Sequence, residues 1–360
     1  MLTKRNLVIL HSNGRGTCAL VRGGALANIS QACMTGEFEF VQSPELIRDE
    51  YIIKHAVAVV INRAYTEEHA STIRHYAQYR RKYGLRVFLD YDDVLWDING
   101  ESLIPDYNPA HIDAVKAGET IAKVADRVDG VLVTCPWLAG CWKARFGTVA
   151  TVVPNFLPKH LYGHRRRRIE DAIKKPVVLY GGSPFHYREG MEGDFEGPWI
   201  PWLTEAVKAG DIELHMFRPE AWMMKEVADR IVWHDPVHCI LWPMTVRDIA
   251  PDIYIAPLQD NAFNRAKSDL KYSEACALGA AFVGSWWKDS CPYAEQHELG
   301  RVTSRTTAEK LAEKVKAICQ PGNFNAVMEH QERHADRMWL EGRANLTYVM
   351  RAICGDAIGA

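Results

Sequence analysis

Hydrophobic runs rich in β-branched residues recur along the first half of the chain, and segments with helical periodicity separate them. The runs lie at 6–12, 38–42, 57–62, 86–91, 130–134 and 149–154, and the helical segments lie at 65–83, 109–127 and 136–145. Continuous apolar strands that alternate with helices are typical of a parallel sheet covered on both faces. The first half is therefore predicted to be a Rossmann-like domain.

The same plan starts again after a break at 154–175, which is rich in Pro and Lys and contains four consecutive arginines, Arg165 to Arg168. The later runs lie at 176–183, 212–217, 230–234, 253–258, 280–285 and 300–304. Two such sheets face to face leave a cleft, and ligands of open α/β sheets bind outside the carboxyl ends of the strands. The predicted units are an N-terminal acceptor domain (1–158), a linker (159–175), a C-terminal donor domain (176–335) and a helix packing back on the first domain (336–360).

Charge and cysteine usage exclude several classes of protein. The 360 residues are long enough for two cores, and 43 basic against 45 acidic residues give a net charge of −2, which provides no global attraction for a polyanion. Nine scattered cysteines contain no CxxC pair, which is typical of thiols in a reducing compartment. The apolar runs are too short for a membrane span, so a cytoplasmic protein is expected.

The stretch FNRAKSDLKYSEACALGAAFVGS, 263–285, concentrates ionisable groups where a helix is predicted to begin. Ser268 is the expected N-cap, Lys271 and Glu274 then share one face, and Asn264 and Lys267 lie in the loop before it. A helix N-terminus beside lysines is suited to phosphate, and a glutamate one turn further in is suited to ribose hydroxyls. The alternative is an intrahelical ion pair on a solvated face.

The segment IYIAPLQDNAFNRAKSDLKYSEACALGAAFVGS resembles the donor-binding segment of GT-B glycosyltransferases, the retaining group related to family 4. The resemblance implies an α/β GT-B fold, with Glu274 on the nucleotide ribose and Lys267, Ser268 and Lys271 beside the diphosphate or the sugar. Many members carry a further glutamate eight residues earlier, where this chain has Ala266. That sugar-binding role is therefore unassigned.

A second acidic cluster, RVFLDYDDVLWDI, follows a buried strand at 86–91. It resembles the nucleophile motif of haloacid-dehalogenase phosphatases, the metal-binding DxD of GT-A enzymes, and an N-domain loop of some GT-B enzymes. Structural acids that cap the next helix are a further alternative. On the GT-B interpretation Asp92 or Asp93 orients or deprotonates the acceptor hydroxyl.

Two glycine-bearing loops complete the predicted donor site. Gly14 and Gly16 follow the first strand, and Gly182, Ser183 and His186 follow the first strand of the second half. Glycines allow a backbone to approach phosphate closely, although such loops are most often only tight turns.

The predicted reaction is transfer of a sugar from a nucleotide-diphosphate donor, with a UDP-sugar favoured, to an acceptor hydroxyl, without a metal or other cofactor. A hydroxymethylated base in phage DNA, reached by base flipping, is one expected acceptor, and a glycan or small molecule is the alternative. The basic run Arg165 to Arg168 is a candidate contact for a DNA backbone, or a solvated face. A phosphatase and a nucleotide-sugar binding protein without turnover are the remaining hypotheses.

Overall fold

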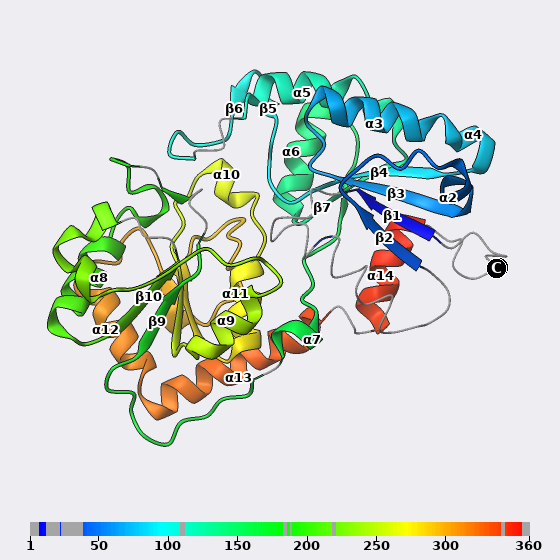
Figure 1. Ribbon diagram of the computed structural model, residues 1–360. Helices are drawn as coiled ribbons and strands as arrows, with labels where there is room; N and C mark the ends of the chain where they lie inside the picture. Colours follow the sequence, from blue (N-terminus) through cyan, green and yellow to red (C-terminus); the bar gives the residue numbers. More distant parts are fainter. Residues whose placement is uncertain are drawn as a thin grey trace.

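A computed structural model describes residues 7–11, 22, 39–108, 112–163, 165–182, 186–187, 189–217, 221–339 and 343–354. Two lobes lie side by side, each built on its own parallel sheet (Figure 1). The expectation of two Rossmann-like halves is confirmed, and every predicted strand is present.

The N-terminal sheet has six parallel strands in the order β2-β1-β3-β4-β7-β8. Its strands are β1 (Leu7–His11), β2 (Glu39–Ser43), β3 (Ala56–Asn62), β4 (Arg86–Tyr91), β7 (Gly130–Val133) and β8 (Thr151–Val152). A short antiparallel pair, β5 (Asp97–Ile98) and β6 (Glu101–Ser102), stands apart from it. Its helices are α2 (Glu50–His55), α3 (Glu67–Ala77), α4 (Tyr79–Tyr83), α5 (Ala114–Ala122) and α6 (Pro136–Phe146), with a 3-10 turn at Ala125–Arg127.

The C-terminal sheet repeats the arrangement with six parallel strands in the order β11-β10-β9-β12-β13-β14. Its strands are β9 (Val177–Tyr180), β10 (Glu213–Phe217), β11 (Val232–His234), β12 (Ile253–Ala256), β13 (Ala281–Ser285) and β14 (Arg301–Val302). Its helices are α8 (Trp199–Ala209), α9 (Trp242–Ile249), α10 (Ala262–Arg265), α11 (Leu270–Leu278), α12 (Ala308–Ile318) and α13 (Pro321–Met338). The short helix α7 (Lys159–Tyr162) and 3-10 turns at Gly193–Phe195, Ala221–Arg230 and Glu298–Gly300 complete the order.

The sheets form because the residues of their central strands are mostly apolar and covered, whereas the edge strands β2, β8, β11 and β14 are more exposed. All four residues of β12 and all five of β13 are buried. Such strands can lie only in a sheet with helices on both faces. Two predicted helices are shorter than expected: 65–83 divides into α3 and α4 at Gln78, and 109–127 becomes α5 followed by the 3-10 turn.

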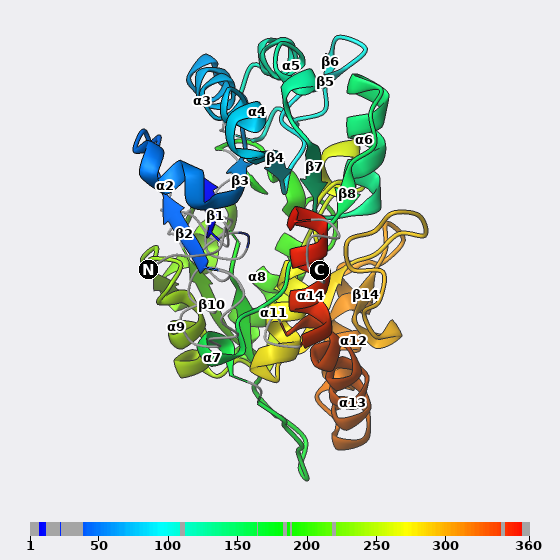
Figure 2. The same cartoon turned by 90° about the vertical axis from the view of Figure 1, so that its right-hand side faces the viewer.

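The last helix, α14 (Arg343–Cys354), lies on the N-terminal lobe although α13 belongs to the C-terminal one (Figure 2). Val349, Met350 and Ile353 are packed into the cluster of buried side chains formed by β1 and β3. The Tyr348 hydroxyl donates to the Val152 carbonyl oxygen at 2.5 Å. The chain end therefore joins the two lobes a second time.

The lobes also meet through α10, which lies between them in Figure 1. Phe263 and Ala266 are packed into the core of the N-terminal lobe. The Trp137 indole N–H donates to the Ala262 carbonyl at 3.1 Å, and the Cys135 thiol donates to the Ala266 carbonyl at 3.3 Å. Residue 266 is fully buried at a contact between lobes, which is not a position open to a sugar.

Across the described ranges, no helix combines the length and apolar character that crossing a bilayer requires. The same residues contain no group of three or more His, Cys, Asp or Glu side chains arranged to hold a metal ion.

Candidate functional site

The predicted donor segment folds as two short helices joined by a turn. Asn261 caps α10, because its side-chain oxygen accepts from the Asn264 backbone N–H at 2.8 Å. The expected N-cap of α11 is wrong by one residue: Asp269 holds that position and makes no side-chain capping hydrogen bond. Ser268 instead accepts from the Asn155 side-chain amide at 2.8 Å, which ties the helix start to the segment after β8. The first N–H groups of α11 therefore keep their capacity to bind an anion.

Glu274 lies one turn into α11 and is 3% exposed. Its Oε1 accepts from the Tyr162 hydroxyl at 2.8 Å and the Trp242 indole N–H at 3.0 Å, and its Oε2 accepts from the Tyr254 hydroxyl at 3.0 Å. A carboxylate offers about four acceptor sites, so Oε2 retains the capacity for a further donor. These three aromatic donors are neutral, and among the described residues no cation lies within ion-pair distance of Glu274.

Lys271 is half-buried on the same helix, and its Nζ donates to the Gly181 carbonyl oxygen at 2.5 Å. Burial lowers the pKa of Lys271, and Lys267 lowers it further, while Glu274 opposes both. Lys267 lies 4.7 Å from the centre of the Phe263 ring and 3.6 Å from Asp93 Oδ1 of the other lobe. Two lysines thus stand at the start of α11; Asp93 pairs with Lys267, and among the described residues no carboxylate lies within ion-pair distance of Lys271.

The acids after β4 are held by arginines of their own lobe. The Arg63 guanidinium donates to Asp92 at 2.5 Å and 3.0 Å and to Asp93 at 2.6 Å. Arg63 has a left-handed backbone, with φ of 50°, and its N–H donates to the Asp90 carbonyl at 2.8 Å. Asp93 therefore lies beside Lys267 of the C-terminal lobe, Asp92 is held by Arg63, and the catalytic roles of both acids stay predictions.

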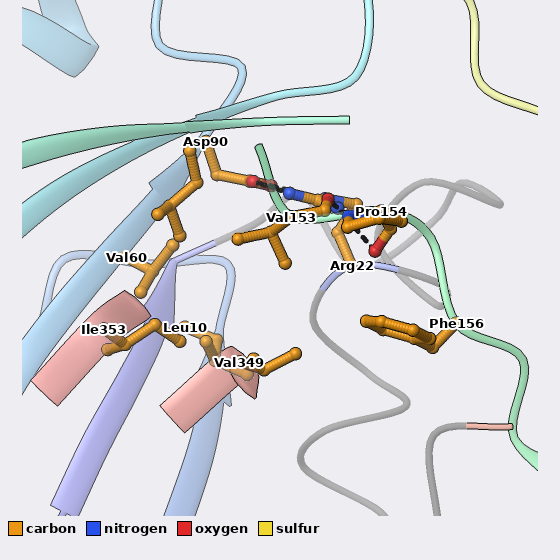
Figure 3. A pocket seen from close by; sticks show the side chains of 10 residues that line it. Leu10, Arg22, Val60, Asp90, Val153, Pro154, Phe156, Val349 and Ile353 are labelled. Carbon is orange, nitrogen blue, oxygen red and sulfur yellow. Dashed lines mark hydrogen bonds and ion pairs between the residues drawn. The ribbon is translucent and has the colours of Figure 1, made fainter. Parts of the chain in front are cut away.

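Asp90 forms a separate buried pair with Arg22, drawn in Figure 3. The Asn62 amide also donates to Asp90 Oδ2, at 2.9 Å. Arg22 reaches the Val153 carbonyl at 2.5 Å and the Asn155 side chain at 3.3 Å, so it joins the end of β4 to the start of the linker. A dehalogenase-type nucleophile must face a phosphate, and Asp90, which is 3% exposed, is taken up by these contacts.

The cavity beside Arg22 is not large enough for a nucleotide. It encloses about 30 Å³ between the N-terminal sheet and α14, enough for about one water, and its walls are mostly apolar (Figure 3). A larger hollow of about 570 Å³ lies in the C-terminal lobe beside the ends of β12, β13 and β14. Its lining includes Trp286, Trp287, Gln259, Asp260 and several Ser and Thr hydroxyls.

The glycine-loop predictions have mixed outcomes. Gly14, Gly16 and Ser183 lie outside the described residues. Gly182 is described, and a side chain there would collide with the Tyr180 hydroxyl, which lies 1.8 Å from the position of its Cβ. Packing alone therefore requires a glycine at 182.

His186 is buried and points to a residue that the sequence analysis missed. Its Nδ1 lies 2.6 Å from Asp194 Oδ2. Asp194 also binds the predicted site residue Asn264, at 2.6 Å, and Tyr107 of the N-terminal lobe, at 2.7 Å. No local pattern marks Asp194, because its partners lie far away along the chain.

The arginine run at 165–168 is mostly engaged with the C-terminal lobe. Arg167 pairs with Asp252, and Arg168 donates to Glu332 at 2.9 Å. The Arg165 N–H donates to the Ala277 carbonyl at 3.0 Å. These contacts fasten the linker to its own domain, so the run is not a continuous free basic patch.

The two six-stranded parallel sheets, joined by a linker and by a returning last helix, define the GT-B fold. Solved structures share it: a glycosyltransferase from Rickettsia africae ESF-5 matches with a TM-score of 0.58 and 11% identity, over 97% of this chain and 99% of that one. Anabaena HepE, in complex with UDP-glucose, matches with a TM-score of 0.56 and 12% identity, over 96% and 98%. An alpha-glucosyltransferase in complex with UDP matches with a TM-score of 0.54 and 12% identity, over 96% and 99%.

No family model and no curated protein matches the chain. At identities near 12% the structural likeness establishes the fold, while donor, acceptor and reaction rest on the residues of this chain.

Proposed function

We propose that the chain is a glycosyltransferase that transfers a sugar from a nucleotide-diphosphate donor to a hydroxyl group. The observation that carries this proposal is the start of α11, where uncapped backbone N–H groups, Lys267 and Lys271 stand one turn before the buried carboxylate Glu274. The oxygens of a diphosphate would accept hydrogen bonds from these N–H groups and from both lysines. A UDP-sugar is the first candidate donor, because two proteins of the same fold carry UDP or UDP-glucose.

The proposed chemistry depends on charge at the leaving group. As the bond between sugar and phosphate breaks, negative charge grows on the departing diphosphate, and donors fixed beside it stabilise the transition state. Lys267, Lys271 and the α11 N–H groups would serve this purpose. Glu274 would accept a ribose hydroxyl on its less occupied oxygen, Oε2. The resemblance to family 4 leads us to propose retention of the anomeric configuration.

We propose a saccharide or another small hydroxyl compound as the acceptor. The hollow of about 570 Å³ has the volume of a small-molecule site and combines flat indole rings with many hydroxyl, amide and carboxyl groups. A hydroxymethylated DNA base is the second proposed acceptor, because two of the four arginines that would hold a DNA backbone, Arg167 and Arg168, are paired with Asp252 and Glu332. Asp93, beside Lys267, is the proposed residue for orienting the acceptor hydroxyl.

The test is a panel of UDP-, GDP- and ADP-sugars, measured first for thermal stabilisation of the protein and then for sugar transfer. Each stabilising donor is offered with glycans, small alcohols, plain DNA and hydroxymethylated DNA. Stabilisation followed by transfer supports the proposal, and NMR of the product gives its anomeric configuration.

Three other results would contradict it. Stabilisation without release of sugar would indicate a nucleotide-sugar binding protein. Magnesium-dependent phosphate release that Asp90→Asn abolishes would indicate a phosphatase. No stabilisation by any nucleotide would remove the donor site altogether.

A further inference from the structure

Asp194 is a buried acid of the C-terminal lobe that accepts hydrogen bonds on both of its carboxylate oxygens. It is 1% exposed and lies in the 3-10 turn Gly193–Phe195. Gly193 has φ of +56°, and a Cβ there would lie 2.2 Å from the His186 carbonyl oxygen, so only glycine lets this turn pass so close to His186. The fold thus brings the Asp194 carboxylate and the His186 imidazole together, and it requires a glycine at position 193 to do so.

The two oxygens of Asp194 have different partners. Oδ2 faces His186 Nδ1 alone, at 2.6 Å. Oδ1 accepts from the Asn264 amide at 2.6 Å, the Tyr107 hydroxyl at 2.7 Å and the Gln259 backbone N–H at 3.0 Å. Three donors on Oδ1 favour the ionised carboxylate, whose Oδ2 then accepts from His186.

The state of His186 follows from this arrangement. Burial lowers the pKa of His186 and outweighs the opposing hydrogen bond from Asp194, and the two lysines at α11 lower it further. Burial tends to raise the pKa of Asp194, but its hydrogen bonds hold that pKa below the ordinary value. The pair at neutral pH is therefore a carboxylate and a neutral imidazole. Because Nδ1 carries the proton that Asp194 accepts, Nε2 carries a lone pair.

The location of His186 gives that lone pair a use. His186 is 7% exposed, and it is close enough to Lys267 and Lys271 for both to act on its charge. These are the lysines that the proposed function places beside the donor diphosphate. A sugar attached to that diphosphate would lie directly beside it. The hydroxyl groups of the sugar are hydrogen-bond donors, and a neighbouring imidazole nitrogen could accept from them. The Tyr107 hydroxyl belongs to the N-terminal lobe and donates to Asp194 of the C-terminal lobe. The full set of contacts around Asp194 therefore forms only when the two lobes are in contact.

We propose that Asp194 is a positioning residue, which holds His186 as the Nδ1–H tautomer and ties it through Tyr107 to the opposite lobe, so that Nε2 accepts a hydrogen bond from a hydroxyl of the donor sugar. This proposal rests on the proposed function and goes beyond it, because it names the group that contacts the sugar. The proposal also accounts for the absence of a sugar-binding glutamate at 266, since His186, on a different loop, would accept the hydrogen bond from the sugar.

The decisive variant is Asp194→Asn. Its amide oxygen can keep the three donors of Oδ1, while its NH₂ now donates to His186 Nδ1, and the ring proton is forced to Nε2. The sugar hydroxyl then meets a donor in place of an acceptor. We expect kcat to fall on the order of 10- to 100-fold, while the affinity for free UDP changes less than about threefold. Tyr107→Phe removes one donor and keeps the tautomer, so about a fivefold fall is expected.

Two-dimensional ¹H–¹⁵N spectra of protein labelled at histidine read the tautomer without any turnover, and His186→Gln identifies the resonances. Wild type and Tyr107→Phe should have a non-protonated Nε2, and Asp194→Asn a protonated one. A donor sugar nucleotide should shift the Nε2 resonance of the wild type, and the matching free nucleotide should not. Asp113→Asn, at an exposed helix cap, and Tyr83→Phe, at a surface contact with Glu50, are the matched controls.

The proposal is overturned if Nε2 of the wild type is protonated, if Asp194→Asn keeps both tautomer and rate, or if sugar nucleotide and free nucleotide give identical spectra. Should Asp194→Asn fail to fold, Tyr107→Phe and the wild-type spectra still decide. Absence of transfer by the wild type counts against the proposed function, whereas the tautomer measurement judges Asp194 independently.

Discussion

The carboxyl ends of the two sheets balance their charges in opposite ways. In the N-terminal lobe Asp90 is matched by Arg22, and Asp92 is matched by Arg63. In the C-terminal lobe Glu274 is held by neutral hydroxyl and indole donors, and Lys271 donates to a neutral carbonyl. The first arrangement is complete without a ligand. In the second, burial lowers the pKa of Lys271, so an anion that binds there would stabilise the charged form of this lysine.

This difference assigns separate tasks to the lobes. Ion pairs within the N-terminal lobe fix the loops after β4 and the start of the linker, whereas the C-terminal lobe offers charge to a substrate. Variants on the two sides should therefore fail differently: the C-terminal ones in binding, and the N-terminal ones in stability.

The largest effect on binding apart from the lysines is expected at Glu274. Glu274→Gln keeps the size and shape of the side chain but replaces one carboxylate oxygen by an amide NH₂ group. That NH₂ group would face donors, either the Tyr162 and Tyr254 hydroxyls and the Trp242 indole or the ribose hydroxyls. UDP affinity should fall about tenfold, measured by calorimetry. Glu313→Gln, exposed on α12, should leave it unchanged. If Glu274→Gln bound UDP as tightly as wild type, Glu274 would not be the residue that binds the ribose.

A loss of stability with little loss of binding is expected at Arg63. Arg63→Met leaves the buried Asp92 without its guanidinium, and a buried acceptor that loses its partner costs about 1–3 kcal/mol. Urea unfolding measures this change. Arg333→Met, which breaks an exposed pair with Glu329, should cost less than about 1 kcal/mol. If Arg63→Met weakened UDP binding and kept full stability, the division of tasks would be wrong.

The smallest effect is expected in the hollow of the C-terminal lobe. Trp286→Ala removes an indole from its wall and should raise the KM for a saccharide acceptor about threefold to fivefold, with UDP affinity unchanged. Initial rates against acceptor concentration measure this change. An unchanged KM would show that the acceptor substrate does not bind in this hollow.

Local sequence was enough to predict the strands, because each is a continuous apolar run whose covering helices lie next to it in the chain. It also brought Lys267, Lys271 and Glu274 together as candidates, because they fall within one short segment, and their roles stay predictions. The N-cap was misplaced by one residue because Ser268 and Asp269 are both good capping residues, and the competing contact that uses Ser268 comes from Asn155, 113 positions away.

The partners that define the site were beyond local reasoning. Tyr107 and Asp194 are separated by 87 positions, and Tyr162 and Glu274 by 112. Arg63 was missed for the same reason, since it meets Asp92 across 29 positions. Such long-range contacts decide which acids form ion pairs within the protein, and the spacing of residues along the chain does not predict them.

The central claim is that a nucleotide diphosphate binds at the start of α11, and UDP titration of wild type and Lys271→Met tests it most directly. Burial disfavours the charged lysine, so the variant without ligand should melt at the same or a higher temperature than wild type. Its UDP affinity should nevertheless fall on the order of 10- to 100-fold. Lys310→Met, exposed on α12, should change neither. A Lys271→Met protein that binds UDP as tightly as wild type would contradict the account.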